Sequence, residues 1–205
     1  MARKFLNDQL VIASHNLGKV REMAKLVAPY DIAVTSAGDI GLGEPEETES
    51  TFIGNAEIKS RAAAAAAQLP AFADDSGIVV PALDGQPGIY SARWGGPQRD
   101  FSLAMARIER ELNERGLVPE GAVAYFVSAL SLCWPDGHVE NFEGIIHGAL
   151  TFPPRGEKGF GYDPIFILEG HNITFGEMAP NDKHALSHRA RAFKKLVAAC
   201  FTADA

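Results

Sequence analysis

The chain has 205 residues, of which 46% are hydrophobic and 22% charged, and its formal net charge is −7. This composition is typical of a globular protein and excludes a disordered or low-complexity chain. The length favours one domain that buries about 70% of the surface exposed on unfolding, enough for a core without disulfides. The acidic balance argues against broad binding to a nucleic-acid backbone, but it allows a few local cations to hold one small anion.

The sequence gives no sign of a membrane span or a disulfide framework. Its apolar runs are short, and none of signal-peptide length follows the charged first nine residues. Cys133 and Cys200 are far apart and belong to no CxxC or Cys/His cluster. We therefore expect a cytoplasmic protein without a zinc site, in which both cysteines are small core residues.

Strands and helices alternate in the first half of the chain. Gln9 to Ser14 is typical of a short buried strand, and apolar residues then recur at helical spacing until Pro29. Residues 32–35 predict a second strand. Residues 51–67 predict a helix, whose six alanines at 62–67 leave little bulk and allow a close neighbour.

After this helix, the sequence predicts a strand that is interrupted by a turn. Residues 71–74 and 78–80 read as two strands on either side of a turn at Asp75-Ser76-Gly77. Apolar spacing from Phe101 to Leu112 then predicts a helix closed by Gly116.

A hairpin and a last helix complete the pattern. Residues 123–134 and 139–152 are strand candidates joined by Pro135-Asp136-Gly137, and Ser187 is an N-cap for the final helix. Alternating strands and helices, then a hairpin and a helix, indicate an α/β protein with a mixed sheet. With no repeat or linker, we expect a single domain over residues 1–205.

The first strand leads into a polar turn, Ser14-His15-Asn16-Leu17-Gly18-Lys19, ahead of a helix. A helix N-terminus with a lysine presents N–H groups and a charge to an anion. It is not a Walker loop, because Ala13 holds the first glycine position and Val20 follows the lysine. Phosphate binding and an ordinary helix cap are both open here.

Four carboxylates crowd one loop: Glu44, Glu46, Glu47 and Glu49. They form either a solvated acidic loop or a source of one or two ligands for a hard cation such as Mg²⁺. On the helix that follows, Asn55 and Lys59 are four residues apart and share a face.

Asp74 and Asp75 should face opposite sides of their strand, because side chains alternate along it. Only one of the two can then point into a given site. A carboxylate at a strand end is suited to metal binding or general-base catalysis. Capping of the turn before Gly77 is the alternative.

Glycines flank an aromatic ring in Gly159-Phe160-Gly161-Tyr162-Asp163. The open face of Phe160 would suit a planar base, with Asp163 accepting N–H donors, although a glycine-rich turn explains the pattern equally. Lys183, His188 and Arg189 add cationic groups, the last two in the first turn of the final helix.

In combination, these segments resemble one family. The ordered series is Ser14-His15-Asn16-x-Gly18-Lys19, Glu46-Glu47-Thr48, Asn55-Ala56-x-x-Lys59, Ala73-Asp74-Asp75-Ser76-Gly77, Gly159-Phe160-Gly161-Tyr162-Asp163-Pro164 and Ser187-His188-Arg189. It is similar to the inosine/xanthosine triphosphate pyrophosphatase family, also called Ham1-like, from Val11 to about Phe193. The resemblance implies an elongated α/β fold with two lobes and a central cleft, a homodimer, and a requirement for Mg²⁺.

The resemblance also implies an activity and the residues that carry it. The activity is hydrolysis of ITP, dITP and XTP to the monophosphate and pyrophosphate, which clears deaminated purines from the nucleotide pool. Residues 14–19 and Lys59 would hold the triphosphate. Glu46 and Asp75 would bind Mg²⁺, and Asp75 would accept the proton of water. The nucleoside end would be held by Ser76, Phe160, Gly161, Tyr162, Asp163, Lys183, His188 and Arg189.

Two departures and two rival functions stay open. Many members carry glycine in place of His15, and histidine restricts positive φ. Many carry glutamate in place of Gly54, so that metal binding here would rest on Glu46, Glu47 or water. The rivals are a nucleotide-binding module without turnover and the related Maf-like pyrophosphatases of other nucleotides.

Overall fold

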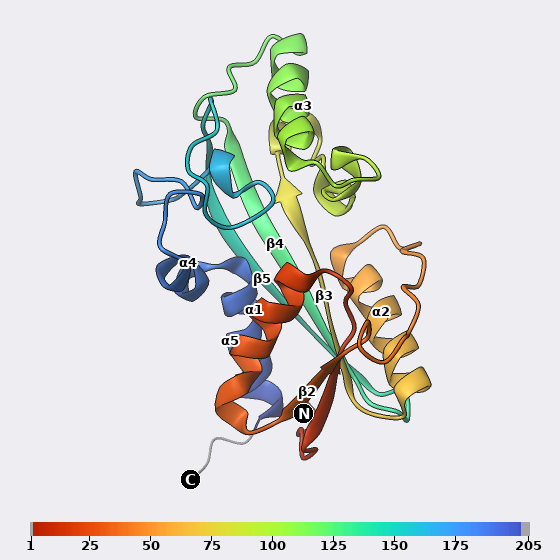
Figure 1. The fold of residues 1–205 in the computed structure, drawn as a ribbon. Coiled ribbons are helices and arrows are strands. Elements are labelled where there is room, and N and C mark those ends of the chain that lie inside the picture. The colour runs from red at the N-terminus through yellow and green to blue at the C-terminus, as the bar shows by residue number, and fades with distance from the viewer. Residues whose placement is uncertain (1, 202–205) are drawn as a thin grey trace. The chain divides into compact units, whose positions relative to one another are not determined.

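The computed structural model describes residues 2–201, so Met1 and residues 202–205 of the predicted single domain lie outside it. The strands are β1 (Gln9–Ile12), β2 (Ala33–Ser36), β3 (Ala71–Val79), β4 (Val123–Cys133), β5 (Val139–Leu150) and β6 (Phe166–Leu168). The longer helices are α1 (Leu17–Val27), α2 (Phe52–Ala67), α3 (Phe101–Glu114), α4 (Pro180–Leu186) and α5 (His188–Cys200). Figure 1 shows these elements in order along the chain.

The predicted mixed sheet is confirmed. Its strand order is β2-β1-β3-β4-β5-β6. β1 pairs in parallel with β2 and with β3, whereas β5 pairs antiparallel with β6. The described chain forms two compact units: the first comprises residues up to Asp75, residues 128–144 and residues from Arg189 onward, and the second comprises residues 76–127 and 145–188.

Strand alternation divides the core of the first unit into two clusters. Leu10 and Ile12 of β1 belong to a cluster with buried residues of α1 and α5, whereas Val11 and Ala13 belong to a second cluster with Ala63 and Ala64 of α2. Successive side chains of a strand point to opposite faces, so α1 and α5 cover one face of this part of the sheet and α2 covers the other (Figure 1).

The second unit has a core of its own, built around α3. The buried face of this helix includes Ala104, Ile108 and Leu112, which cluster with strand residues such as Ile78 and Phe126. The i, i+4 spacing of these helix residues is the pattern that predicted the helix. Cys133 and Cys200 are buried and free, as predicted. Within residues 2–201, no helix is long and apolar enough to cross a membrane.

The turn predicted at Asp75-Ser76-Gly77 is wrong, because β3 is one continuous strand from Ala71 to Val79. Gly77 is explained instead by a close approach: a β-carbon at this position would clash with the Gly88 carbonyl oxygen and the Ser91 hydroxyl. A glycine that makes room for another segment carries the same local signal as a turn glycine. The short elements α4 and β6, of seven and three residues, were not predicted.

Close packing of α2 gives a stability prediction. Ala64 is 1% exposed against β1 and β3, so Ala64→Leu should lower the free energy of unfolding by about 1–3 kcal/mol through overpacking. The exposed neighbour Ala65 is the control, and Ala65→Leu should change stability by less than about 0.5 kcal/mol. Urea unfolding measures both, and equal effects would contradict the packing described.

Candidate active site

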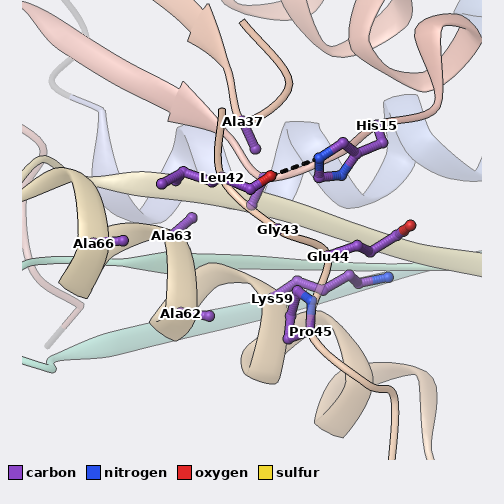
Figure 2. A pocket seen from close by; sticks show the side chains of 11 residues that line it. His15, Ala37, Leu42, Gly43, Glu44, Pro45, Lys59, Ala62, Ala63 and Ala66 are labelled. Carbon is purple, nitrogen blue, oxygen red and sulfur yellow. Dashed lines mark hydrogen bonds between the residues drawn. The ribbon is translucent and has the colours of Figure 1, made fainter. Parts of the chain in front are cut away.

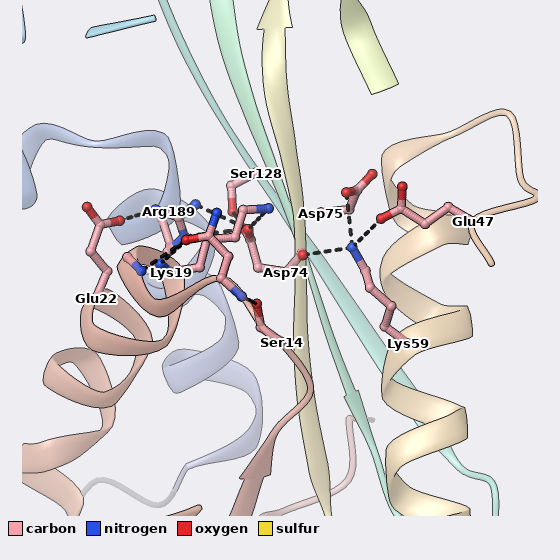
Figure 3. Close-up of polar contacts among 11 residues, drawn as sticks. Ser14, Lys19, Glu22, Glu47, Lys59, Asp74, Asp75, Ser128 and Arg189 are labelled. Carbon is pink, nitrogen blue, oxygen red and sulfur yellow. Dashed lines mark hydrogen bonds and ion pairs between the residues drawn. The ribbon is translucent and has the colours of Figure 1, made fainter. Parts of the chain in front are cut away.

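Asp74 and Asp75 lie on opposite faces of β3, as the alternation predicted (Figure 3). Asp74 lies on the same face of β3 as Phe72, whose ring packs with α1 and α5. Asp75 lies on the same face as Ala73, which packs with α2. Both aspartates are buried, at 1% and 6% exposure. Each carboxylate therefore depends on the groups that its own face supplies.

The Asp74 carboxylate contacts three side-chain donors. Lys19 Nζ lies 2.8 Å from Oδ2, and the Ser128 hydroxyl donates to Oδ1 at 2.6 Å. Arg189 donates to both oxygens, from Nε at 3.3 Å and from Nη2 at 3.1 Å. Burial acts to raise the pKa of Asp74, but attraction to Arg189 and Lys19 outweighs it and holds the pKa well below its ordinary value. Asp74 is therefore a buried anion.

Arg189 is held firmly by this cluster. It is 1% exposed, and its Nη1 donates to Glu22 while Nε and Nη2 contact Asp74. Two anions and two cations thus balance one another, with Lys19 as the fourth member. A bidentate guanidinium–carboxylate pair fixes orientation as well as charge. Sequence reasoning had given Arg189 a substrate role and had assigned no role to Ser128 or Glu22.

The Asp75 carboxylate lies on the other face, against Lys59 of α2. Lys59 Nζ is 3.1 Å from Asp75 Oδ1 and 2.8 Å from Glu47 Oε1, and it donates to the Asp74 carbonyl oxygen at 3.1 Å (Figure 3). Burial raises the pKa of Asp75, and attraction to Lys59 and Lys19 offsets this only in part. Burial acts to lower the pKa of Lys59, but Asp75 and Glu47 outweigh it and raise the pKa.

One oxygen of Asp75 has no hydrogen-bond partner among the residues that the structure describes. Oδ2 is buried and makes no hydrogen bond within residues 2–201. A buried polar atom of this kind calls for a ligand, an ion or water to satisfy it. Carboxylate oxygens suit Mg²⁺, which commonly takes one or two carboxylates and completes its shell with water and phosphate oxygens. No group of three or more His, Cys, Asp or Glu side chains that could hold a metal occurs among the described residues.

The acidic loop brings Glu47, rather than Glu46, to Lys59. Glu47 is half-buried against the ammonium, and Glu46 is exposed. Asn55 anchors the loop, because its Oδ1 accepts a hydrogen bond from the Glu49 backbone N–H at 3.0 Å. Glu47 is therefore better placed than Glu46 to bind a cation together with Asp75. The metal role predicted for Glu46 stays a prediction.

The turn at residues 14–19 is a capped helix start. Asn16 is the N-cap of α1, and its Oδ1 accepts hydrogen bonds from the backbone N–H groups of Gly18 at 2.9 Å and Lys19 at 3.1 Å. Ser14 accepts from the Asn16 backbone N–H at 3.2 Å, and the Leu17 side chain is 67% exposed. A phosphate here would meet donors that already have a partner, so Lys19 is the residue of this turn that supplies charge.

His15 does not strain this turn, since it is not among the residues with positive φ. Its Nε2 hydrogen-bonds with the Leu42 carbonyl oxygen at 2.8 Å and so ties the turn to the loop that precedes the acidic residues (Figure 2). Beneath this contact is a largely apolar pocket of about 230 Å³, lined by this loop, by alanines of α2 and by Lys59. The small side chains of the alanine run in α2 leave room for this pocket.

The Gly54 departure also has a local explanation. A β-carbon at this position would lie 2.6 Å from the Glu49 β-carbon. The Glu49 side chain therefore occupies the room into which a longer residue at position 54 would extend. Replacement of glycine here would require the acidic loop to move.

In the second unit, a glycine-flanked loop presents Phe160. Gly159 and Gly161 have positive φ, at 78° and 70°, and the Phe160 side chain is 38% exposed. Asp163 Oδ2 accepts from the Phe160 backbone N–H at 2.7 Å and contacts Lys183 Nζ at 2.6 Å. The Lys183 ammonium also lies 4.8 Å from the centre of the Phe160 ring. The loop, Asp163 and Lys183 thus form one group, and their role as ligands stays a prediction.

The remaining predicted residues of this unit differ in exposure. Ser76 is half-buried. His188 is 8% exposed and stacks on Phe126 with ring centres 5.0 Å apart. Tyr162 is 3% exposed, and its hydroxyl donates to the Ser91 carbonyl oxygen at 2.8 Å. Burial raises the pKa of Tyr162, so this residue acts as a neutral core side chain that supports the loop.

A mixed α/β sheet with buried carboxylates beside lysine and arginine is suited to an enzyme that handles a phosphorylated ligand. Comparison with known proteins agrees. A family model described as the Ham1 family matches residues 10–199, and the chain belongs to this family.

Relatives and solved structures of this family are closely similar. The dITP/XTP pyrophosphatase of Rhodospirillum centenum is 62% identical over 97% of this chain and 98% of its own length. That of Bradyrhizobium sp. is 60% identical over 95% of each chain. The structure of a HAM1 protein from Coxiella burnetii superposes with a TM-score of 0.84, at 34% identity, covering 93% of this chain and 96% of that chain.

The Asp74 cluster gives a prediction for acid stability. Since the folded pKa of Asp74 is lowered, its contribution is present above its unfolded pKa of about 3.9 and is lost as the pH falls toward the folded value. Asp74→Asn leaves two cations, Lys19 and Arg189, against the single carboxylate of Glu22 in this cluster and should cost about 3 kcal/mol or more at pH 7.

Urea unfolding at pH 7 and at pH 3 measures this effect. The difference between wild type and Asp74→Asn should shrink at the lower pH, while Asp8→Asn, at an exposed aspartate, serves as the control. A difference that is small at pH 7, or that does not change with pH, would contradict the buried-anion assignment.

Proposed function

We propose that this protein is a pyrophosphatase of deaminated purine nucleoside triphosphates, dITP, ITP and XTP, which it hydrolyses to the monophosphate and pyrophosphate in the presence of Mg²⁺. The observation that carries the proposal is the buried Asp75 carboxylate, with one oxygen on Lys59 and the other without a protein partner. The names of relatives up to 62% identical, dITP/XTP pyrophosphatases, support the choice of substrate.

Lys19, Lys59 and Asp75 would act on the phosphates. Lys19 and Lys59 supply positive charge toward the triphosphate, which would otherwise repel an attacking oxygen. Asp75, together with Glu46 or Glu47, would hold Mg²⁺. When bound, the metal ion neutralises phosphate charge and orients the phosphate oxygens.

Asp75 would also act as the general base. A carboxyl pKa that burial raises is closer to neutral pH than that of an exposed aspartate, which improves proton acceptance. The water oxygen forms a bond to the α-phosphorus, the α–β bridging P–O bond breaks, and pyrophosphate leaves with the bonding electron pair. The proton of the water passes to Asp75.

Phe160 and the residues around it would hold the base. The exposed face of Phe160 is suited to stacking, and Lys183 beside it supplies a cation. Ser76, His188 and the N–H groups of the loop would add polar contacts, and donors there favour the 6-keto oxygen of hypoxanthine and xanthine over the 6-amino group of adenine. The substrate roles assigned to residues 14–19, to 160–163 and to Arg189 are part of this proposal.

A homodimer and a cytoplasmic location are further parts of the proposal. The homodimer follows from the family resemblance, and the location follows from the short apolar runs and the cysteine usage of the sequence. A small-molecule substrate, rather than nucleic acid, agrees with the net charge of −7.

The products formed from XTP and Mg²⁺ test the reaction. We expect one pyrophosphate per monophosphate and no orthophosphate, and Asp75→Asn should lower kcat by at least about 100-fold through loss of the general base. Asp31→Asn, at an exposed turn, is the control. Release of orthophosphate would indicate a stepwise phosphatase. Binding of XTP in calorimetry without product would indicate a binding module. Preference for pyrimidine nucleotides would indicate the Maf-like alternative.

Base stacking on Phe160 is tested separately. Because a base–aromatic stack contributes about 1–3 kcal/mol, Phe160→Ala should raise KM for dITP at least about fivefold, with pyrophosphate still the product. Tyr90→Leu removes another exposed aromatic ring of the second unit and should leave KM unchanged. An unchanged KM in Phe160→Ala would remove Phe160 from the proposed base site.

A further inference from the structure

Lys59 occupies the position of a counter-ion between two carboxylates. Its ammonium contacts Glu47 at 2.8 Å and Asp75 at 3.1 Å, and its side chain is 7% exposed. Figure 3 shows the nitrogen of Lys59 pointing between these carboxylates. An ammonium in this position neutralises one of the two negative charges that would otherwise attract a divalent cation.

The second observation is the unpartnered Asp75 Oδ2. Asp75 is 6% exposed, and its Oδ2 makes no hydrogen bond within residues 2–201. Lys59 therefore satisfies only one of the two oxygens of the Asp75 carboxylate, which would bind the metal ion. The site has one cation for two carboxylates and leaves one oxygen of Asp75 unsatisfied, which is the state expected of a temporary partner.

We propose that Lys59 competes with the divalent cation for Asp75 and Glu47, so that metal binding displaces the Lys59 ammonium from these carboxylates and releases it toward the triphosphate. This inference rests on the proposed function for the presence of the metal ion. Two positive groups on the same carboxylates repel each other, so both cannot hold them fully. The Asp74 carbonyl oxygen, 3.1 Å from Nζ, is a neutral acceptor that Lys59 can keep after it leaves.

Metal binding without nucleotide tests the competition. Calorimetric titration of Mn²⁺ into Lys59→Met should give an affinity at least about tenfold higher than that of wild type, because the internal cation is gone. Lys59→Arg keeps the charge and should bind no more tightly than wild type. Lys25→Met, at an exposed lysine of α1, is the matched control and should also bind like wild type.

The double variant Glu47→Gln/Lys59→Met locates the effect. Removal of one of the two carboxylates should abolish the gain seen in Lys59→Met. Circular dichroism verifies that each variant folds, and Lys59→Gln, which keeps a neutral donor for the Asp74 carbonyl oxygen, replaces Lys59→Met if the latter does not fold. Equal or weaker Mn²⁺ binding by the folded neutral variant, or a gain that survives loss of Glu47, would overturn the proposal.

The outcome is separate from that of the catalytic test. The titration contains no nucleotide, so a protein that releases orthophosphate or prefers pyrimidines would refute the proposed function and leave the competition standing. A protein that releases pyrophosphate while Lys59→Met binds Mn²⁺ like wild type would refute only the competition.

Discussion

The alternation of side chains along β3 is the constraint on which the first unit depends. It sends two consecutive aspartates to opposite faces, so that the same strand carries two different electrostatic environments. Asp74 meets Lys19 and bidentate Arg189, and its pKa falls although it is buried. Asp75 is paired with Lys59, and burial raises its pKa. The number of cations on each face, rather than depth of burial, thus separates a permanent anion from a carboxylate that can exchange protons or partners.

The sequence predicted most of the elements of the fold, because each element carries its own local signal. β1 and α2 follow from apolar pattern and helix spacing, and the start of α5 follows from its cap. The break predicted within β3 failed for a physical reason: Gly77 makes room for Gly88 and Ser91, which lie more than ten residues further along the chain. Local sequence cannot distinguish a glycine required by a distant segment from one required by a turn.

The site was predictable in its residue types but only in part in its contacts. Periodicity alone gave the opposite orientation of Asp74 and Asp75. The choice of Glu47 over Glu46 beside Lys59 depends on how the acidic loop is anchored by Asn55, which the loop composition does not encode. The pairing of Arg189 with Asp74 joins residues 115 apart in the chain, and such a pair arises only when α5 packs on the sheet.

Arg189 and Lys59 differ in side-chain chemistry, and each suits the carboxylate that it contacts, Asp74 and Asp75 respectively. The guanidinium of Arg189 is planar, and it makes parallel contacts with Asp74 while a further nitrogen contacts Glu22, so movement would break several hydrogen bonds at once. The ammonium of Lys59 is a compact charge on a flexible stem, and its contacts with Glu47, Asp75 and the Asp74 carbonyl oxygen can be exchanged one at a time. An arginine therefore fixes the face that must stay charged, and a lysine serves the face whose carboxylates must become available. This difference in side-chain chemistry is the physical reason to place the proposed metal exchange and proton transfer on the Asp75 side of the strand.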